Sequence, residues 1–235
     1  MPETKRRGAN VCRNGFSALC IAAAMGASEI AEAQVPPSPA EISVYDGLHL
    51  AAWRGDLPAL RQAVAAGGGL EARDGQGRTA LHVAAHARQR AAMRELAKAG
   101  ADPRALDGRA YDAITIAAVA DDIETMRTAL AIGGDPRAIT SPYQGTALIA
   151  AAHLGHDGVV RELIAAGAPL DHVNNLGWTA LIEAVILGNG GPRHVETVKA
   201  LVAAGARRDL ADREGTTPLE HARRRGYAAM VALLQ

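Results

Sequence analysis

Histidines are the residues of this sequence whose type and spacing could allow metal binding. His82 and His86 lie four residues apart on one predicted helix, and His153 and His156 lie three apart. A zinc site needs at least one further ligand that converges on the same point. The sequence contains no HExxH phrase, and both of its cysteines lie within residues 1–33. It therefore predicts structural histidines, with no metal and no cofactor.

Nucleophilic and phosphate-binding motifs are missing after residue 33. Three serines remain there, Ser38, Ser43 and Ser141, and none of them stands in a GxSxG elbow. The glycine-rich stretch AAGGGLEARDGQG lacks the lysine and the serine or threonine that end a phosphate-binding loop. We therefore expect a protein that is not an enzyme.

The charge of the chain is balanced, with 25 Lys and Arg residues against 25 Asp and Glu residues. Proteins that bind nucleic acid present a basic surface to the phosphates, and a balanced composition does not predict one. We therefore expect no nucleic-acid partner. Aromatic residues make up 3% of the chain and glycines number 25, a composition that suits closely packed helices with small side chains at their contacts.

The N-terminus differs from the rest of the sequence. KRRGANVCR is basic, GFSALCIAAAMGAS is apolar, and AEA at 31–33 precedes QVPPSPA. This order is typical of a secretory signal peptide, and the apolar run is too short to span a bilayer as an ordinary helix. We expect a signal peptide over 1–33, a Pro-rich linker over 34–40, export to the periplasm, and no membrane contact after cleavage. A cytosolic chain with an amphipathic N-terminus is the alternative.

One phrase recurs along the chain. Aligned on its threonine, it reads DGQGRTALHVAA, YQGTALIAAA, NNLGWTALIEA and DREGTTPLEHA, with Thr79, Thr146, Thr179 and Thr217. Thr146 and Thr179 are 33 residues apart, and the longer gap after Thr79 holds a further unit, DGRAYDAITIAAV. VYDGLHLAAWRGD precedes the series. A step near 33 residues is typical of a repeat made of a turn and two helices.

The second half of each unit repeats as well. RAAMRELAKAG, GVVRELIAAG and HVETVKALVAAG place apolar residues three and four positions apart, as on one stripe of a helix. Each run ends in glycine, which leaves a helix readily through a left-handed turn. Segments rich in Asp, Asn and Gly follow, and they favour tight hairpins.

From about residue 41 onward the sequence is similar to ankyrin-repeat proteins, whose pattern D-x-x-G-x-T-P-L-H-x-A-A is close to DGQGRTALHVAA. The resemblance implies an all-α fold, an ankyrin-repeat solenoid of stacked helix-turn-helix units with protruding hairpin tips. In that family the threonine caps the inner helix and a histidine in the TxLH phrase ties the turn down, and His82 keeps this phrase. Asp112 replaces the threonine in the third unit. Gln144 stands at the glycine position of the fourth unit, whose hairpin is therefore expected to be irregular.

The resemblance places the domain at 41–235, with repeats at about 41–73, 74–106, 107–140, 141–173 and 174–211 and a C-terminal cap at 212–235. The fifth repeat carries an insert, GNGGPRH at 188–194, between its helices. This insert and its flanking phrases resemble a group of exported bacterial ankyrin-repeat proteins. Some members of that group are linked to periplasmic protection from oxidants beside a catalase.

Ankyrin-repeat proteins usually bind partner proteins on a concave face made of hairpin tips and inner helices. We expect the position before each capping threonine to be exposed at a tip, and a second free position to lie on the inner helix. With one further aromatic residue on the fourth tip, these positions give the candidate partner-binding residues Tyr45, Trp53, Arg78, His86, Tyr111, Tyr143, His153 and Trp178.

The leading hypothesis is a monomeric, non-enzymatic protein–protein interaction module in the periplasm. Two alternatives remain open. The tip aromatics could pack sideways and serve to stiffen the stack. Alternatively, His86, His153 and the tip aromatics could bind a metal ion or a small molecule.

Overall fold

The structure is a computed structural model that describes residues 36–235, and its regular elements within this range are all helices. Its elements are α3 (Pro39–Ser43), α4 (Gly47–Arg54), α5 (Leu57–Ala65), α6 (Ala80–His86), α7 (Arg90–Lys98), α8 (Ala113–Val119), α9 (Ile123–Ala131), α10 (Ala147–Leu154), α11 (Asp157–Ala165), α12 (Ala180–Ile186), α13 (Pro192–Ala203), α14 (Pro218–Arg224) and α15 (Ala228–Leu234). None of these helices is long and apolar enough to cross a membrane.

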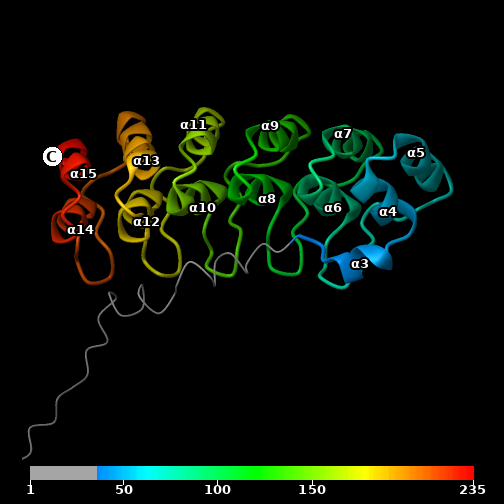
Figure 1. Cartoon of the computed structure of the whole chain (residues 1–235), viewed down its shortest axis with the longest axis horizontal. Helices are drawn as coiled ribbons and strands as arrows, with labels where there is room; N and C mark the ends of the chain where they lie inside the picture. The colour runs from blue at the N-terminus through cyan, green and yellow to red at the C-terminus, as the bar shows by residue number, and fades with distance from the viewer. Residues whose placement is uncertain (1–35) are drawn as a thin grey trace, which may run out of the picture.

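The helices stand in two rows (Figure 1). The inner row is α4, α6, α8, α10, α12 and α14, and each inner helix packs against the outer helix that follows it in the chain. Neighbouring pairs pack side by side, so that α10 contacts both α8 and α12. Turns protrude beyond the inner row (Figure 1). The predicted solenoid of stacked helical pairs is confirmed.

Threonines begin most of the inner helices. The Oγ1 atoms of Thr146 and Thr179 accept hydrogen bonds from backbone N–H groups three residues ahead, at 3.3 Å and 3.2 Å. Thr217 forms a capping box with Glu220. These bonds satisfy N–H groups that a helix leaves without an internal partner. The recurring threonine is therefore the local signal that sets where four of the inner helices start, and Asp46 and Asp112 take its place before α4 and α8.

The protruding turns, called the hairpin tips below, share one closing hydrogen bond. The first residue of each tip donates its N–H to the carbonyl of the last residue at 2.8–3.0 Å, over 74–78, 107–111, 140–145, 174–178 and 212–216. The fourth tip is one residue longer than the others. In that tip, Ser141 and Gln144 both adopt positive φ angles, 71° and 53°. The predicted irregularity of this hairpin is confirmed.

A continuous apolar core runs between the rows. Alanines such as Ala84, Ala118 and Ala152 let the inner helices approach closely, and leucines such as Leu148 and Leu181 are buried against them. A single helical pair cannot bury its apolar face alone, so each repeat depends on its neighbours. The rigid stack then fixes where the side chains of the inner face lie.

The N-terminal end of the described chain differs in part from the sequence-based expectation. The predicted signal peptide, 1–33, lies outside the described residues. The linker predicted over 34–40 is partly wrong, because helix α3 begins at Pro39. Ser38 caps this helix and forms a capping box with Glu41, and proline is favoured in the first turn. Ser38 and Glu41 have the spacing of a capping box in the sequence, but the neighbouring prolines favoured a linker as the interpretation.

The insert of the fifth repeat is partly helical. From Pro192 it adds to α13, which has 12 residues where α11 has 9. Arg193 forms ion pairs with Asp157 of the preceding repeat, at 3.1 Å, and with Asp121 of the repeat before that, at 2.9 Å. The hydroxyl of Tyr227 donates to the carbonyl of Gly188 at 3.0 Å. The insert therefore ties four consecutive repeats together.

Candidate functional site

The last side chain of a hairpin tip lies along the inner helix that follows it. Trp178 is 3% exposed and forms an apolar cluster with Ile182 and Ile186, four and eight residues later on α12. The backbone N–H of Trp178 donates to Oδ1 of Asn174 at 3.0 Å. The expectation that Trp178 is exposed at the tip is wrong, because its indole covers the apolar face that α12 turns away from the core.

Tyr111 and Arg78 follow the same rule. Tyr111 is 4% exposed, and burial raises the pKa of its hydroxyl to about 12. Arg78 is buried as well, and its guanidinium forms ion pairs with Asp74 at 2.7 Å and with Glu41 at 2.5 Å. The expectation of exposed tip positions is therefore wrong for Tyr111 and Arg78 too. The carboxylates of the tip and of α3 draw the Arg78 guanidinium inward.

The fourth repeat breaks this rule, because the corresponding position holds Gly145. Trp178 and Tyr111 fill the places on either side of it, on the fifth and third repeats. Glycine has no side chain to lie along α10, so a hollow remains between the two rings. This hollow is a cavity of about 60 Å³ on the inner face.

Three consecutive repeats line the cavity. Its walls are mainly apolar or aromatic, with a few polar groups, and consist of Tyr111, Thr115, Val119, Thr140, Ser141, Tyr143, Gly145, Thr146, Ile149, Ala150, His153, Asn174, Leu176, Trp178, Glu183 and Leu187. Small-molecule sites have this character, with apolar walls and a few fixed polar groups. Four predicted partner-binding residues, Tyr111, Tyr143, His153 and Trp178, come together here.

A buried carboxylate is among the groups that line this cavity. Glu183 is 5% exposed. Its Oε1 accepts a hydrogen bond from Nδ2 of Asn174 at 2.7 Å, and its Oε2 lies 3.3 Å from Nδ1 of His153. Asn174 is itself fixed, since its Oδ1 accepts the N–H groups of Leu176 and Trp178 at 3.0 Å. The carboxylate is thus held by Asn174 of its own repeat and by His153 of the preceding one.

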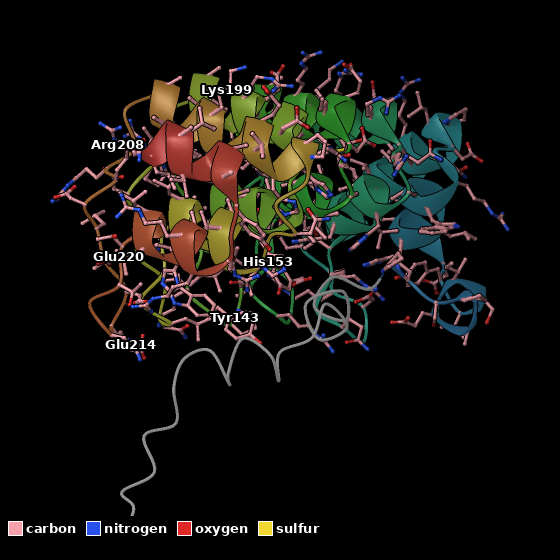
Figure 2. All side chains as sticks on the ribbon, turned by 60° about the vertical axis from the view of Figure 1, so that its left-hand side comes forward. Tyr143, His153, Lys199, Arg208, Glu214 and Glu220 are labelled. Carbon is pink, nitrogen blue, oxygen red and sulfur yellow. The ribbon has the colours of Figure 1, made fainter. Side chains whose placement is uncertain are left out.

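Tyr143 is the candidate residue on the fourth tip, and it is half-buried. Figure 2 shows Tyr143 among the tips and His153 above it, at the level of the inner helices. The longer fourth tip places the Tyr143 ring at the rim of the cavity. Its side chain is available to a molecule that approaches the inner face.

The other four candidates, Tyr45, Trp53, Arg78 and His86, do not line this cavity. The hydroxyl of Tyr45 donates to Oδ2 of Asp74 at 2.6 Å, so it stabilises the first tip. Trp53 and His86 are half-buried on the first two repeats. Burial, followed by the nearby Arg78, lowers the pKa of His86 to about 4. These residues form no single site with those of repeats three to five.

Sequence reasoning missed Glu183, Asn174 and Gly145. A signal for Glu183 was present, since it is an acidic residue within TALIEAV on the stretch that packs as an inner helix. The effect of Gly145 became visible with the structure, because the hollow depends on the rings of two neighbouring repeats.

The histidine pairs do not assemble a metal site within residues 36–235, where no group of three or more His, Cys, Asp or Glu residues is arranged to hold an ion. His82 instead bonds within its capping phrase. Its Nδ1 accepts the N–H of Thr79 at 3.1 Å, and its Nε2 donates to the carbonyl of Tyr111 at 3.0 Å. His156 donates from Nδ1 to the carbonyl of Ala118 at 2.9 Å. Both side chains link neighbouring repeats.

Comparison with known protein families identifies the fold's family. A family model described as ankyrin repeats (3 copies) matches residues 19–107, 48–138 and 114–207, which together span more than half of the chain. The chain belongs to the ankyrin-repeat family. Ankyrin repeats generally mediate protein–protein interaction rather than catalysis. No match was found among curated proteins.

Solved structures resemble this ankyrin-repeat protein over most of its length. An ankyrin repeat domain from Acinetobacter baumannii is 44% identical, with a TM-score of 0.75, and the match covers 80% of this chain and 95% of that one. The ankyrin repeat domain of Bcl-3, a member of the IkappaB protein family, is 29% identical with a TM-score of 0.73, covering 81% and 85%. A chain from the complex of a Bdellovibrio bacteriovorus predatory endopeptidase with its immunity protein shares the fold at 22% identity, with a TM-score of 0.67 and coverage of 81% and 97%.

Proposed function

We propose that this protein is a non-enzymatic binding module that holds a partner protein on its inner face, across repeats three to five. The observation that carries the proposal is the half-buried ring of Tyr143 at the rim of an apolar cavity. Tyrosine and tryptophan dominate interface energetics because they bury a large apolar area and lose little conformational freedom. The surrounding helices are packed rigidly, so little ordering entropy is lost when a partner binds.

We place the protein in the periplasm, as a monomer. The support for export is the order of a basic opening, an apolar run and small residues before the expected cleavage point after residue 33. Mass spectrometry of the protein from the periplasmic fraction should give a chain that begins at residue 34. Uncleaved protein confined to the cytosol would contradict this location. A role in protection from oxidants rests on the resemblance of the insert, and a deletion strain should then be more sensitive to hydrogen peroxide.

Cross-linking in cells tests partner binding directly. The full chain, carrying an affinity tag, is cross-linked in its own periplasm, and captured proteins are quantified for wild type, Tyr143→Ala and Lys199→Ala. Lys199 is exposed on the outer helix α13 and pairs with Glu196 of the same helix, so it serves as a matched surface control (Figure 2).

The expected result is a defined partner that Lys199→Ala retains and that Tyr143→Ala loses by about tenfold, the effect of a residue that contributes roughly 1.4 kcal/mol to binding. Equal capture by all three proteins would place any interface away from the inner face of repeats three to five. The same melting temperature for the two variants would show that the difference does not arise from unfolding.

A further inference from the structure

The cavity beside Gly145 combines aromatic rings with one carboxylate. Tyr111, Tyr143 and Trp178 contribute the rings, and they come from the third, fourth and fifth hairpin tips. Glu183 is the one carboxylate among the residues that line the cavity, and its Oε2 lies 3.3 Å from Nδ1 of His153. Aromatic faces carry partial negative charge and attract cations, most strongly where water is excluded. The cavity therefore favours a positively charged occupant.

The buried carboxylate adds to this preference. Asn174, a neutral donor, and His153 are the hydrogen-bond partners of Glu183, and no lysine or arginine lines the cavity. A carboxylate in an apolar setting interacts with a nearby cation more strongly than it would in water. A strongly hydrated cation such as a lysine ammonium would lose its water on entry. A cation that is itself covered with methyl groups would lose far less.

The cavity is small, which limits its occupant to a compact group. Its volume of about 60 Å³ is less than half of the roughly 150 Å³ of a protein cavity that binds benzene. A trimethylammonium group, with one nitrogen and three methyl carbons, has fewer heavy atoms than benzene. The apolar walls would contact its methyl groups while its charge faces the rings and Glu183.

We propose that this cavity binds an alkylated ammonium group, held by the rings of Tyr111, Tyr143 and Trp178 and by the carboxylate of Glu183. The group would belong either to a free small cation or to a methylated side chain of a protein. This site goes beyond the proposed partner interface, since a free cation would occupy it without any protein partner.

Trp178 provides the signal for a binding test on the full chain. The chain has two tryptophans, and Trp53 does not line the cavity, so Trp53→Phe isolates the emission of Trp178. This protein is titrated with choline chloride, with sodium chloride as an ionic-strength control, and with 3,3-dimethylbutan-1-ol, which has the shape of choline without its charge. We expect saturable binding of choline and binding of the neutral alcohol that is at least about tenfold weaker, a factor typical of a desolvated cation–π site.

Gly145→Leu is the decisive variant. A Cβ added at Gly145 meets its nearest heavy atoms at 3.5 Å and 3.7 Å, in ordinary contact, so the backbone accepts a side chain that would fill the hollow. We expect this variant to melt no lower than the parent and to lose choline binding. Glu183→Gln keeps the shape of the carboxylate and should weaken choline binding by about tenfold while leaving the weak binding of the alcohol unchanged. Tyr143→Leu, at the rim, should weaken choline binding without lowering the melting temperature.

The outcomes separate this site from the partner interface. Absence of saturable choline binding, equal binding of the alcohol, or unchanged binding by Gly145→Leu would each overturn the proposal, and partner capture in cells would be unaffected by that result. A peptide that contains trimethyl-lysine is compared with its unmethylated form to identify the source of the group. Tighter binding of the methylated peptide than of choline assigns the site to a protein side chain, and the reverse order assigns it to a free cation.

Discussion

The imidazole of His194 lies directly over Gly155. Its Nε2 donates to the carbonyl of His153, two residues before Gly155, at 3.0 Å. A Cβ built on Gly155 would lie 2.8 Å from the imidazole ring. Gly155 ends α10 in the left-handed conformation, with φ at 68°. His194 of the insert therefore covers the C-terminal end of α10, and it leaves no space for a side chain at Gly155.

Gly155→Ala should destabilise the protein for two separable reasons. Alanine in the left-handed region costs roughly 1–2 kcal/mol, and the added methyl group would also displace the His194 ring. Gly226→Ala is the matched control, because Gly226 has φ at 70° and nothing within 4 Å of an added Cβ. In urea unfolding, we expect Gly155→Ala to lose more stability than Gly226→Ala. Adding His194→Ala should remove the further penalty of Gly155→Ala, and equal losses in the two single variants would contradict the steric contact.

Gly145→Ala should stabilise the protein, whereas Gly155→Ala should destabilise it. Its backbone lies outside the left-handed region and its surroundings leave room for a methyl group, so alanine mainly reduces the entropy of the unfolded chain. Such substitutions stabilise by about 0.4–1 kcal/mol. Gly177→Ala is the control, since Gly177 has φ at 86° and an added Cβ would meet Arg213 at 2.6 Å. Thermal unfolding should show a raised midpoint for Gly145→Ala and a lowered midpoint for Gly177→Ala.

The capping threonines and the period near 33 residues predicted the fold, because both are local signals that each repeat carries by itself. Tyr111, Tyr143, His153 and Trp178 were also predicted as one surface, and they line one cavity. The direction of two of these side chains was predicted wrongly, since Tyr111 and Trp178 are buried rather than exposed at the tips. Whether a ring projects from a tip or lies along its helix depends on residues four and eight positions later, as at Ile182 and Ile186.

Asp112 stands where the family has threonine, and its replacement should stabilise the protein. Its Oδ1 accepts the N–H of Thr115 at 2.7 Å, but its Oδ2 is buried without a partner. Burial raises the pKa of this carboxyl above its ordinary value. A buried polar atom without a partner costs about 1–3 kcal/mol, so Asp112→Thr should raise the free energy of unfolding by an amount in this range at pH 7.

The pH dependence of Asp112→Thr checks the cause. The folded protein binds the proton of Asp112 more readily than the unfolded chain does, so the wild-type penalty shrinks as pH falls toward the ordinary carboxyl range. The advantage of the variant should therefore be larger at pH 7 than near pH 4. An advantage of Asp112→Thr that is independent of pH would exclude the buried charge as its source.

His86 should make the protein less stable in mild acid. Its pKa in the folded state is about 4, below the value of 6.5 expected in the unfolded chain. As pH falls below 6.5, His86 binds a proton in the unfolded chain but not in the folded protein. The free energy of unfolding therefore falls. By pH 5 the loss is about 2 kcal/mol, from 1.5 pH units at 1.36 kcal/mol each. His86→Gln should lose less stability than wild type between pH 7 and pH 5 by this amount, and parallel curves would contradict the assignment.

Tyr143→Ser and Trp178→Ser should separate binding from stability. The Tyr143 ring is half-buried at the cavity rim, whereas the Trp178 indole covers Ile182 and Ile186. Removing a buried aromatic side chain typically costs about 3–5 kcal/mol, so Trp178→Ser should strongly lower the midpoint of unfolding. Tyr143→Ser should cost less than about 1 kcal/mol, since a partly exposed side chain leaves no cavity behind. If instead Tyr143→Ser unfolded as readily as Trp178→Ser, the rim tyrosine would be a structural residue, and loss of partner capture by Tyr143 variants would report unfolding rather than a contact.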